Sequence, residues 1–581
     1  MLLKHLNNAL MIHKRLKIGA PRVIKIFREE KMAYKLMTLG IFGVMVWFLI
    51  NVAVNVIAGA KIPNEILEPS NVALTNLFIE GKSPYTLSAL EWEIPGINYD
   101  YPFLASLAAA GISKLTGLSA AAAHYLLSYM SMLLSGIVGY LIIRKYALTT
   151  VAPVLGAFLF LLCHWRFGFI SAAPDDFGLL LFLLTLYCAV MPGIKNKPPV
   201  CAIGVTLCFY TKQYFVFAAL GIFIYFLFYS RREAIRFFLY TVIINIVAGV
   251  LITIFWPLYW TYSVFFLYIG CFSGTGSGFG YLLGQLKYLA AIFIGLFAVL
   301  VVALVKIIRK MRAEHKKFDS LCPKENDALS LFVIQIPVMF FPLVFFGRND
   351  GAFLSYFLQL WMPSIVVVAL IAFERMKPEK REWLYQGIYA GVIMFTVYFG
   401  LGKLPMHKIT QEEQEAWDRA NAYVDEYREY GEVYYARSLA YRAFEEGRDD
   451  CICGHDGELS KETLELWENS QFLKRIFPHA GDIINKVLAY RVDLQLKASL
   501  HDYSLVTFEE DGYSMIFARE FLEEMMFEYL DEMDLQLGNM SYHVVFYKAE
   551  PFDEATENEL MEDEKYLNYR SRHGKEENSI Y

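Results

Sequence analysis

Long apolar stretches that lack charged side chains recur along the first two thirds of the chain and constrain its fold more than any other feature. A helix needs about 20 mostly apolar residues to cross the hydrocarbon layer of a bilayer. The whole chain is 56% hydrophobic and only 19% charged, which excludes an ordinary cytosolic or a disordered protein. The sequence predicts about eleven membrane-spanning helices, near residues 36–60, 119–143, 147–165, 177–194, 198–211, 214–230, 237–257, 288–305, 328–347, 351–373 and 383–402.

Charge divides the chain into two parts. Residues 1–403 hold 35 Lys and Arg against 19 Asp and Glu, whereas residues 404–581 hold 18 against 40. A hydrocarbon layer does not accept the dense acidic charge of the second part. The sequence therefore predicts a basic, apolar membrane domain over residues 36–403 and an acidic domain outside the lipid.

The placement of basic residues predicts the orientation of the membrane domain. Short cytoplasmic loops are rich in Lys and Arg, and such residues fill segment 1–35 and every second connector after it. We therefore expect a multi-pass plasma-membrane protein with a cytoplasmic N-terminus, in which segment 1–35 is a basic amphipathic helix at the inner leaflet. An odd number of crossings then places residues 404–581 on the extracytoplasmic side.

The first outer loop, residues 61–118, is the longest in the membrane domain. Pro69 and the apolar run after it predict a helix that ends at Gly81, with Glu68 at its start. Residues 103–117 predict a second short helix closed by Gly117. One interpretation is that both helices only pack at the interface, and that Glu68 is a charge favoured by the helix dipole.

Apart from the cytoplasmic connectors, the charged side chains of the membrane domain lie at its outer face, and none lies at mid-bilayer. They include Asp100, Arg166, Asp175, Lys212 and Arg348. An ion-coupled transporter usually has ionisable groups near the bilayer midplane and repeated halves, and the sequence has neither. This pattern favours chemistry at the lipid–water boundary. A polysaccharide or lipid-linked sugar transporter or flippase, and a receptor-like membrane protein, are the alternatives.

Four short motifs follow one another on the predicted outer side. They are Glu68 followed by Gly81-x-x-Pro84-Tyr85 and Tyr101-Pro102, then Pro174-Asp175-Asp176-x-Gly178, then Thr211-Lys212-Gln213, and last Gly351-Ala352 with Tyr356. In this order they resemble motifs of the GT-C superfamily of membrane glycosyltransferases, which includes protein O-mannosyltransferases and the lipid A aminoarabinose transferase. Ala173 stands where the family usually has Arg, and Ser355 where it usually has Asn.

The resemblance implies a mostly α, polytopic membrane helix bundle with an extracytoplasmic C-terminal α/β domain. It implies an inverting glycosyltransferase that moves a sugar from a polyprenyl-phosphate donor to an acceptor hydroxyl at the outer face. The acceptor would be an envelope glycan, a lipid or a protein, and the source a bacterium. We expect the lipid bilayer as a partner and no nucleic acid.

The resemblance also assigns roles to residues. Glu68 matches the family position of the general base, and Asp100 and Asp175 are further candidates. The leaving phosphate needs positive charge, for which the candidates are Lys212, Arg348 and Arg166. Arg166 could instead be a snorkelling interfacial residue. The motif residues expected to bind substrate are Tyr85, Tyr101, Gln213 and Tyr356.

No metal site is assigned from the sequence. The outer carboxylates could bind a divalent cation, since hard cations prefer oxygen ligands, but no ligand spacing requires one. No other cofactor is expected.

The acidic part reads as a soluble α/β domain over residues 404–552 and a charged tail over 553–581. Helical periodicity predicts helices at 411–430, 461–476 and 518–535. Short β-like runs predict strands at 432–435, 503–507 and 542–547.

Overall fold

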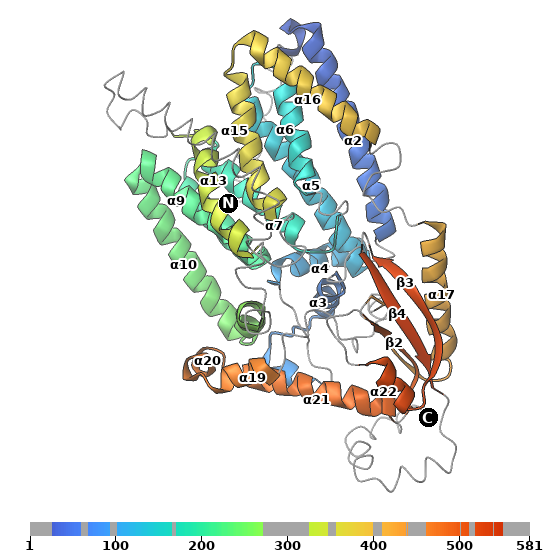
Figure 1. Cartoon of the computed structure of the whole chain (residues 1–581). Helices are drawn as coiled ribbons and strands as arrows, with labels where there is room; N and C mark the ends of the chain where they lie inside the picture. The colour runs from blue at the N-terminus through green and yellow to red at the C-terminus, as the bar shows by residue number, and fades with distance from the viewer. Residues whose placement is uncertain are drawn as a thin grey trace, which may run out of the picture. The chain divides into compact units, whose positions relative to one another are not determined.

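The computed structural model of the chain describes twelve segments: residues 26–59, 68–92, 101–164, 170–270, 325–346, 356–398, 410–436, 438–439, 461–499, 501–510, 517–537 and 540–549 (Figure 1). The chain forms two compact units. The first contains Met1–Lys61, Tyr101–Leu251 and Thr275–His407, and the second contains Ile62–Asp100, Ile252–Gly274 and Lys408–Tyr581. The predicted outer loop is thus divided, and residues 62–100 group with the C-terminal part of the chain.

The described part of the first unit is helical. Its elements are α2 (Met32–Gly59), α4 (Leu104–Thr116), α5 (Ala120–Arg144), α6 (Val151–Leu162), α7 (Asp175–Val190), α8 (Lys197–Thr211), η2 (Gln213–Phe217), α9 (Ala218–Tyr229), α10 (Arg231–Phe255, which runs just past the unit boundary), α13 (Ala328–Phe346), η5 (Phe357–Trp361), α15 (Met362–Glu374) and α16 (Pro378–Tyr398). Each predicted span within the described residues coincides with a helix. The predicted span at 288–305 lies outside the described residues.

Four of the described helices are long and apolar enough to cross a membrane by themselves. They are Met32–Val54, Ala120–Arg144, Arg231–Phe255 and Phe357–Glu374. In α10 only Ala234 and Phe237 are buried, and the rest of its surface is mostly large apolar side chains open to the surroundings. A surface of this kind is stable only against lipid, so the chain is a membrane protein.

Close helix packing holds the first unit together. Helices α5 and α6 make extensive contact, as do α7 and α8. At Gly139 of α5 an added Cβ would lie 3.0 Å from the carbonyl oxygen of Gly156 and 2.6 Å from the Phe160 ring. The absence of a side chain at Gly139 therefore sets the distance between α5 and α6.

The basic connectors of the first unit gather at one end of the bundle. Lys145, which follows α5, and Lys197, which begins α8, both donate to Asn326 just before α13. At the same end Lys31 pairs with Glu382 of α16 at 2.5 Å. This grouping is what an alternating up-and-down course of helices produces.

At this end a buried carboxylate accepts hydrogen bonds from the turn that precedes α6. Glu374 is 1% exposed, and its two oxygens accept hydrogen bonds from the backbone N–H groups of Leu148 and Thr149, the Thr149 hydroxyl and the Tyr385 hydroxyl. The N–H groups that open a helix have no partner within the helix. Glu374, at the end of α15, satisfies donors that immediately precede α6 and ties three helices together.

Replacing Glu374 by Gln is expected to destabilise the first unit by about 2–3 kcal/mol, because a buried set of N–H and O–H donors would face an NH₂ group. Equilibrium unfolding of the full chain in mixed detergent micelles measures this. The control is Glu382→Gln, which removes only the more exposed pair with Lys31 and is expected to cost about 0–1 kcal/mol. Equal losses in the two variants would contradict the role given to Glu374.

The second unit is an α/β structure with the outer-loop residues attached. Its elements are α3 (Glu68–Glu80), η1 (Leu87–Glu91), η3 (Thr261–Gly270), α17 (Gln411–Arg428), β1 (Glu432–Tyr434), α19 (Lys461–Glu468), α20 (Gln471–Ile476), α21 (Ala480–Ser499), β2 (Tyr503–Glu509), α22 (Arg519–Glu524), β3 (Glu528–Leu537) and β4 (Met540–Lys548). Gly81, at φ +80°, directly follows α3, as the sequence predicted.

The four described strands form one sheet in the order β1-β2-β4-β3. β1 and β2 are parallel, whereas β2–β4 and β3–β4 are antiparallel. Helix α17 packs on the sheet, and its Trp417 Nε1 donates to the carbonyl oxygen of Gln536 in β3 at 3.1 Å. The predicted strands at 432–435, 503–507 and 542–547 are confirmed within a few residues.

The helix predicted at 518–535 is wrong. Helix α22 ends at Glu524, Met526 adopts a positive φ of 63°, and strand β3 begins at Glu528. In β3 the buried side chains Met533 and Leu535 alternate with acidic ones, which is the period of a strand with one buried face. The helix predicted at 461–476 is interrupted as well, since Ser470 caps a new helix, α20.

Residues 68–92 of the outer loop pack within the second unit. Lys486 of α21 donates to the carbonyl oxygens of Leu90, at 2.8 Å, and Trp92. The N–H of Leu258 donates to the carbonyl oxygen of Tyr85 at 3.0 Å. Three separate parts of the sequence thus form one body.

A charged cluster of this unit joins strands β3 and β4 to the start of α22 and the residue after β2. His543 Nδ1 lies 2.9 Å from Asp534 Oδ1, while Arg519 pairs with Glu510 at 2.5 Å and with Glu532 at 2.6 Å. The hydrogen bond with Asp534 and the neighbouring carboxylates raise the pKa of His543 above its ordinary value, against the opposing effect of partial burial.

Because its pKa is raised on folding, His543 stabilises the sheet below about pH 6.5, and this stabilisation is lost as pH rises through the folded pKa. We expect His543→Gln to lower the hydrogen-exchange protection of the β3–β4 amides about 2–5-fold at pH 5.5, which corresponds to the energy of a partly exposed ion pair. At pH 9 the substitution should hardly change the protection. Exchange measured by mass spectrometry on the full chain, corrected for intrinsic rates, checks this. The same loss at both pH values would show that the charge of His543 is unimportant.

Candidate active site

A buried ion pair joins the starts of two segments in the first unit. Lys212 lies at the turn between α8 and η2, and its ammonium pairs with the carboxylate of Asp175, the first residue of α7. Lys212 is 4% exposed and Asp175 is 3% exposed. The Tyr214 hydroxyl lies 3.2 Å from Asp175 Oδ1 and 2.7 Å from Gln359 Oε1, so its single proton can go to either. The pair thus belongs to a network that reaches η5.

Three tyrosine rings surround the ammonium of Lys212. Its Nζ lies 4.8 Å from the ring centre of Tyr101, 5.1 Å from that of Tyr214 and 5.9 Å from that of Tyr356. The rings of Tyr214 and Tyr356 meet edge to face at 4.7 Å. Such rings stabilise a desolvated cation by up to about 2 kcal/mol each. The rings and Asp175 together allow a lysine to remain charged in a buried position.

A buried histidine–aspartate contact involves the residue that follows Asp175, and the sequence analysis missed it. His164 Nδ1 lies 2.9 Å from Asp176 Oδ1, and the His164 side chain is fully buried. Among the residues that the structure describes, no group bonds to His164 Nε2. A buried nitrogen without a partner costs about 1–3 kcal/mol, so it marks a place where a ligand or water would bind. A lone histidine at the end of an apolar run carries no motif that could have revealed it.

Four of the sequence-predicted site residues come together in this cluster. Lys212 contacts Tyr101, Asp175 and Tyr356. These four residues come from four separate motifs. Gln213 is buried at the start of η2, next to Lys212 in the sequence. The candidates Asp100, Arg166 and Arg348 lie outside the described residues.

The other two predicted residues belong to the second unit. Glu68 is fully buried at the first position of α3. Tyr85 is also fully buried, and its ring packs against those of Trp256 at 5.7 Å, Tyr259 at 5.3 Å and Tyr262 at 5.9 Å. Tyr85 therefore has a packing role, whatever it contributes to binding.

The described residues contain no group of three or more His, Cys, Asp or Glu that could hold a metal ion. The divalent cation considered from the sequence stays a prediction.

No protein-family model and no curated protein matches the chain. Two solved structures are similar to it over most of its length, both of ArnT from Cupriavidus metallidurans. The crystal structure bound to undecaprenyl phosphate covers 88% of this chain and 97% of its own, with 14% sequence identity and a TM-score of 0.43. The apo structure covers 87% of this chain and 98% of its own, with 13% identity and a TM-score of 0.42.

Proposed function

We propose that the chain is a membrane glycosyltransferase that transfers a sugar from a polyprenyl-phosphate donor to a hydroxyl group of an acceptor, with inversion at the anomeric carbon. The acceptor classes are an envelope glycan, a lipid and a protein. In this proposal the reaction occurs at the extracytoplasmic face of a bacterial plasma membrane, with the N-terminus in the cytoplasm.

The observation that carries the proposal is the convergence of motif residues on Lys212. Four motifs, separated by between about 40 and 140 residues of sequence, supply Tyr101, Asp175, Lys212 and Tyr356. A merely structural membrane protein has no reason to bury a lysine among three tyrosine rings at one end of its bundle, because removing an ammonium from water is costly. Binding of a lipid-linked phosphate supplies such a reason.

The acceptor hydroxyl must lose its proton as its oxygen attacks the anomeric carbon, so a carboxylate is needed as general base. We assign this role to Glu68, since it holds the family position and is buried at a helix start. Asp175 is less suited, because its oxygens already face Lys212 and Tyr214. Asp100 is the other candidate.

The leaving group is the phosphate of the carrier, which departs as an anion when the sugar–oxygen bond breaks. Lys212 is the cation that we expect to stabilise this charge, with Arg348 and Arg166 as further candidates. A phosphate that binds Lys212 must share the ammonium with Asp175. Asp175 therefore moderates the affinity for the carrier, and an ammonium that is shared releases the product more easily.

His164 is proposed as a positioning residue. Asp176 accepts the Nδ1–H proton in the neutral ring, which leaves Nε2 as an acceptor for a hydroxyl group. Sugars offer several such hydroxyls.

The test separates transfer from transport. Purified protein in liposomes would receive polyprenyl-phosphate sugars labelled in the sugar, together with a bacterial envelope extract as the source of acceptors. Both cleavage of the sugar–phosphate bond and movement of the intact donor across the bilayer would be followed. The proposal expects free polyprenyl phosphate and labelled acceptor in equal amounts. Movement of the intact donor without cleavage would instead support the flippase alternative.

A further inference from the structure

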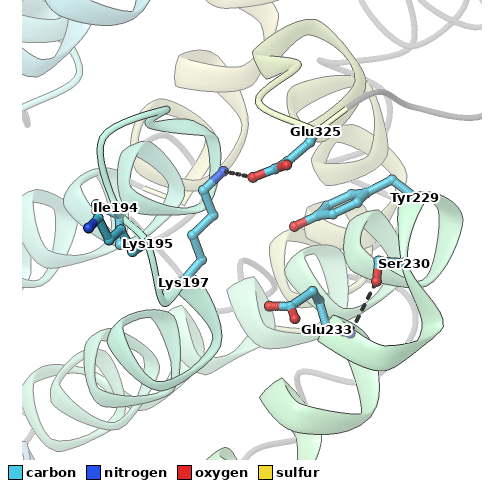
Figure 2. A pocket seen from close by; sticks show the side chains of 7 residues that line it. All are labelled: Ile194, Lys195, Lys197, Tyr229, Ser230, Glu233 and Glu325. Carbon is cyan, nitrogen blue, oxygen red and sulfur yellow. Dashed lines mark hydrogen bonds and ion pairs between the residues drawn. The ribbon is translucent and has the colours of Figure 1, made fainter.

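A polar cavity lies at the end of the first unit where the basic connectors gather. Its volume is about 610 Å³, and it is lined by Ile194, Lys195, Lys197, Tyr229, Glu233 and Glu325, together with Ser230 (Figure 2). The lining comes from the connector between α7 and α8, the start of α8, the end of α9, the first turn of α10 with Ser230 before it, and the residue that precedes Asn326. The cavity belongs neither to the Lys212 cluster nor to the proposed reaction.

The lining has four charged groups, Lys195, Lys197, Glu233 and Glu325, and each of its two carboxylates already has a cation beside it. Lys197 lies 3.4 Å from Glu325 and also donates to Asn326. Glu233 pairs with Arg236 at 3.0 Å. Both carboxylates are therefore neutralised by cations within the protein.

What remains in the cavity is a set of donors. Lys195 is exposed, and among the described residues nothing pairs with it. The Tyr229 hydroxyl points into the space between Lys197 and Glu233 (Figure 2), and no described residue bonds to it. The Ser230 oxygen accepts from the N–H of Glu233 at 3.4 Å, which leaves its own O–H free to donate. One cation and two hydroxyls without acceptors suit an anion with several oxygens, such as a phosphate diester.

The surfaces beside the cavity indicate where such a phosphate would come from. Helices α8 and α10 start at the cavity and stay adjacent, since Arg236 donates to Asn196 and Asn245 donates to Thr206, both at 2.9 Å. Both helices expose large apolar side chains just beyond the cavity: Val200 and Ile203 on α8, and Ile235, Phe238 and Leu239 on α10. Acyl chains attached to a phosphate in the cavity would find an apolar surface along these helices.

We propose that this cavity binds the phosphate diester headgroup of an anionic membrane lipid, with the acyl chains along α8 and α10. Lys195 and the hydroxyls of Tyr229 and Ser230 hold the phosphate oxygens. A pocket between helices that offers a lysine and hydroxyl donors has the chemistry to hold a phosphate.

The experiment uses the full chain in nanodiscs of phosphatidylcholine with and without phosphatidylglycerol, followed by native mass spectrometry of the lipids retained. Wild type is expected to retain phosphatidylglycerol in preference to phosphatidylcholine. The double variant Lys195→Gln/Tyr229→Phe is expected to lower the retention of phosphatidylglycerol about fivefold or more, because one basic residue near a membrane surface contributes roughly that factor to the binding of anionic lipid. Lys380→Gln, which removes an exposed lysine that does not line the cavity, is the matched control and is expected to behave as wild type.

Two results would overturn the proposal. The first is equal retention of phosphatidylglycerol by wild type and the double variant, or no preference for it in wild type. The second is displacement of phosphatidylglycerol by inorganic phosphate at equal concentration, which would show that the cavity binds free phosphate. Thermal unfolding of the variants in phosphatidylcholine alone establishes that they are folded. A failed sugar-transfer assay has no bearing on any of these outcomes.

Discussion

Replacing Glu68 by Gln is expected to lower kcat for sugar transfer about 10²–10⁴-fold, the usual contribution of a general base. Gln has the same size as Glu and can still accept hydrogen bonds at the start of α3, but it does not take up the acceptor proton. KM for the donor should change little, since proton removal is needed only in the transition state. Initial rates over a range of donor concentrations measure both quantities.

The matched control for this variant is Glu80→Gln. Glu80 lies at the other end of α3, where its half-exposed side chain pairs with Lys82 at 2.9 Å. The Glu80→Gln variant should have the kcat of the wild type. Unchanged turnover in the Glu68 variant would exclude Glu68 as the base, and Asp100 would become the first candidate.

The second large effect concerns the pair of Lys212 and Asp175. Lys212→Met and Asp175→Asn are each expected to destabilise the first unit by about 3–5 kcal/mol, because each leaves one buried charge without its partner. The double variant Lys212→Met/Asp175→Asn has no such charge, and we expect it to lose much less stability than the sum of the two. Equilibrium unfolding in mixed micelles measures the three losses.

Carrier binding distinguishes this structural role from the functional one. The double variant should be folded yet fail to bind polyprenyl phosphate, since the cation is gone.

Two results would contradict these expectations. Additive losses of stability would mean that the pair is not coupled in the folded protein. Normal binding of the carrier by the double variant would exclude Lys212 as its phosphate ligand.

The helices of the membrane domain could be predicted from the sequence because the lipid imposes one simple condition on them. A stretch without charged residues and of sufficient length has few alternatives to a spanning helix. The ends of α3 and α4 were predictable too, because Gly81 and Gly117 are suited to the left-handed backbone that follows a helix.

The strand β3 was not predictable from its own residues. The segment from 528 to 537 is rich in Glu, Leu and Met, which favour helices, and its polar residues can also lie on the exposed face of a strand. Its pairing with β4 decides the outcome, and pairing is a tertiary effect that a local period does not contain.

The candidate site was likewise predictable only in part: several of its residues could be named from the sequence, but their contacts could not. Lys212 and Asp175 stood out as charged residues in apolar surroundings, so each could be named from the sequence. Their pairing depends on the packing of α7 against α8, which brings together residues 37 positions apart. His164 belongs to no motif, and Asp176 lies in one only as the neighbour of Asp175, so only the geometry revealed that pair.

The length of α7 has a consequence for the depth of the site. Its 16 residues span about 24 Å at 1.5 Å per residue, whereas the hydrocarbon layer is about 30 Å thick. For the proposed enzyme, placing Val190 at one boundary of that layer would leave Asp175 about 6 Å short of the other. A phosphate carried on a lipid can enter to that depth while its chain stays among the other acyl chains, but a soluble sugar nucleotide would have to leave water altogether. We therefore expect the proposed enzyme to favour a donor that is already part of the membrane.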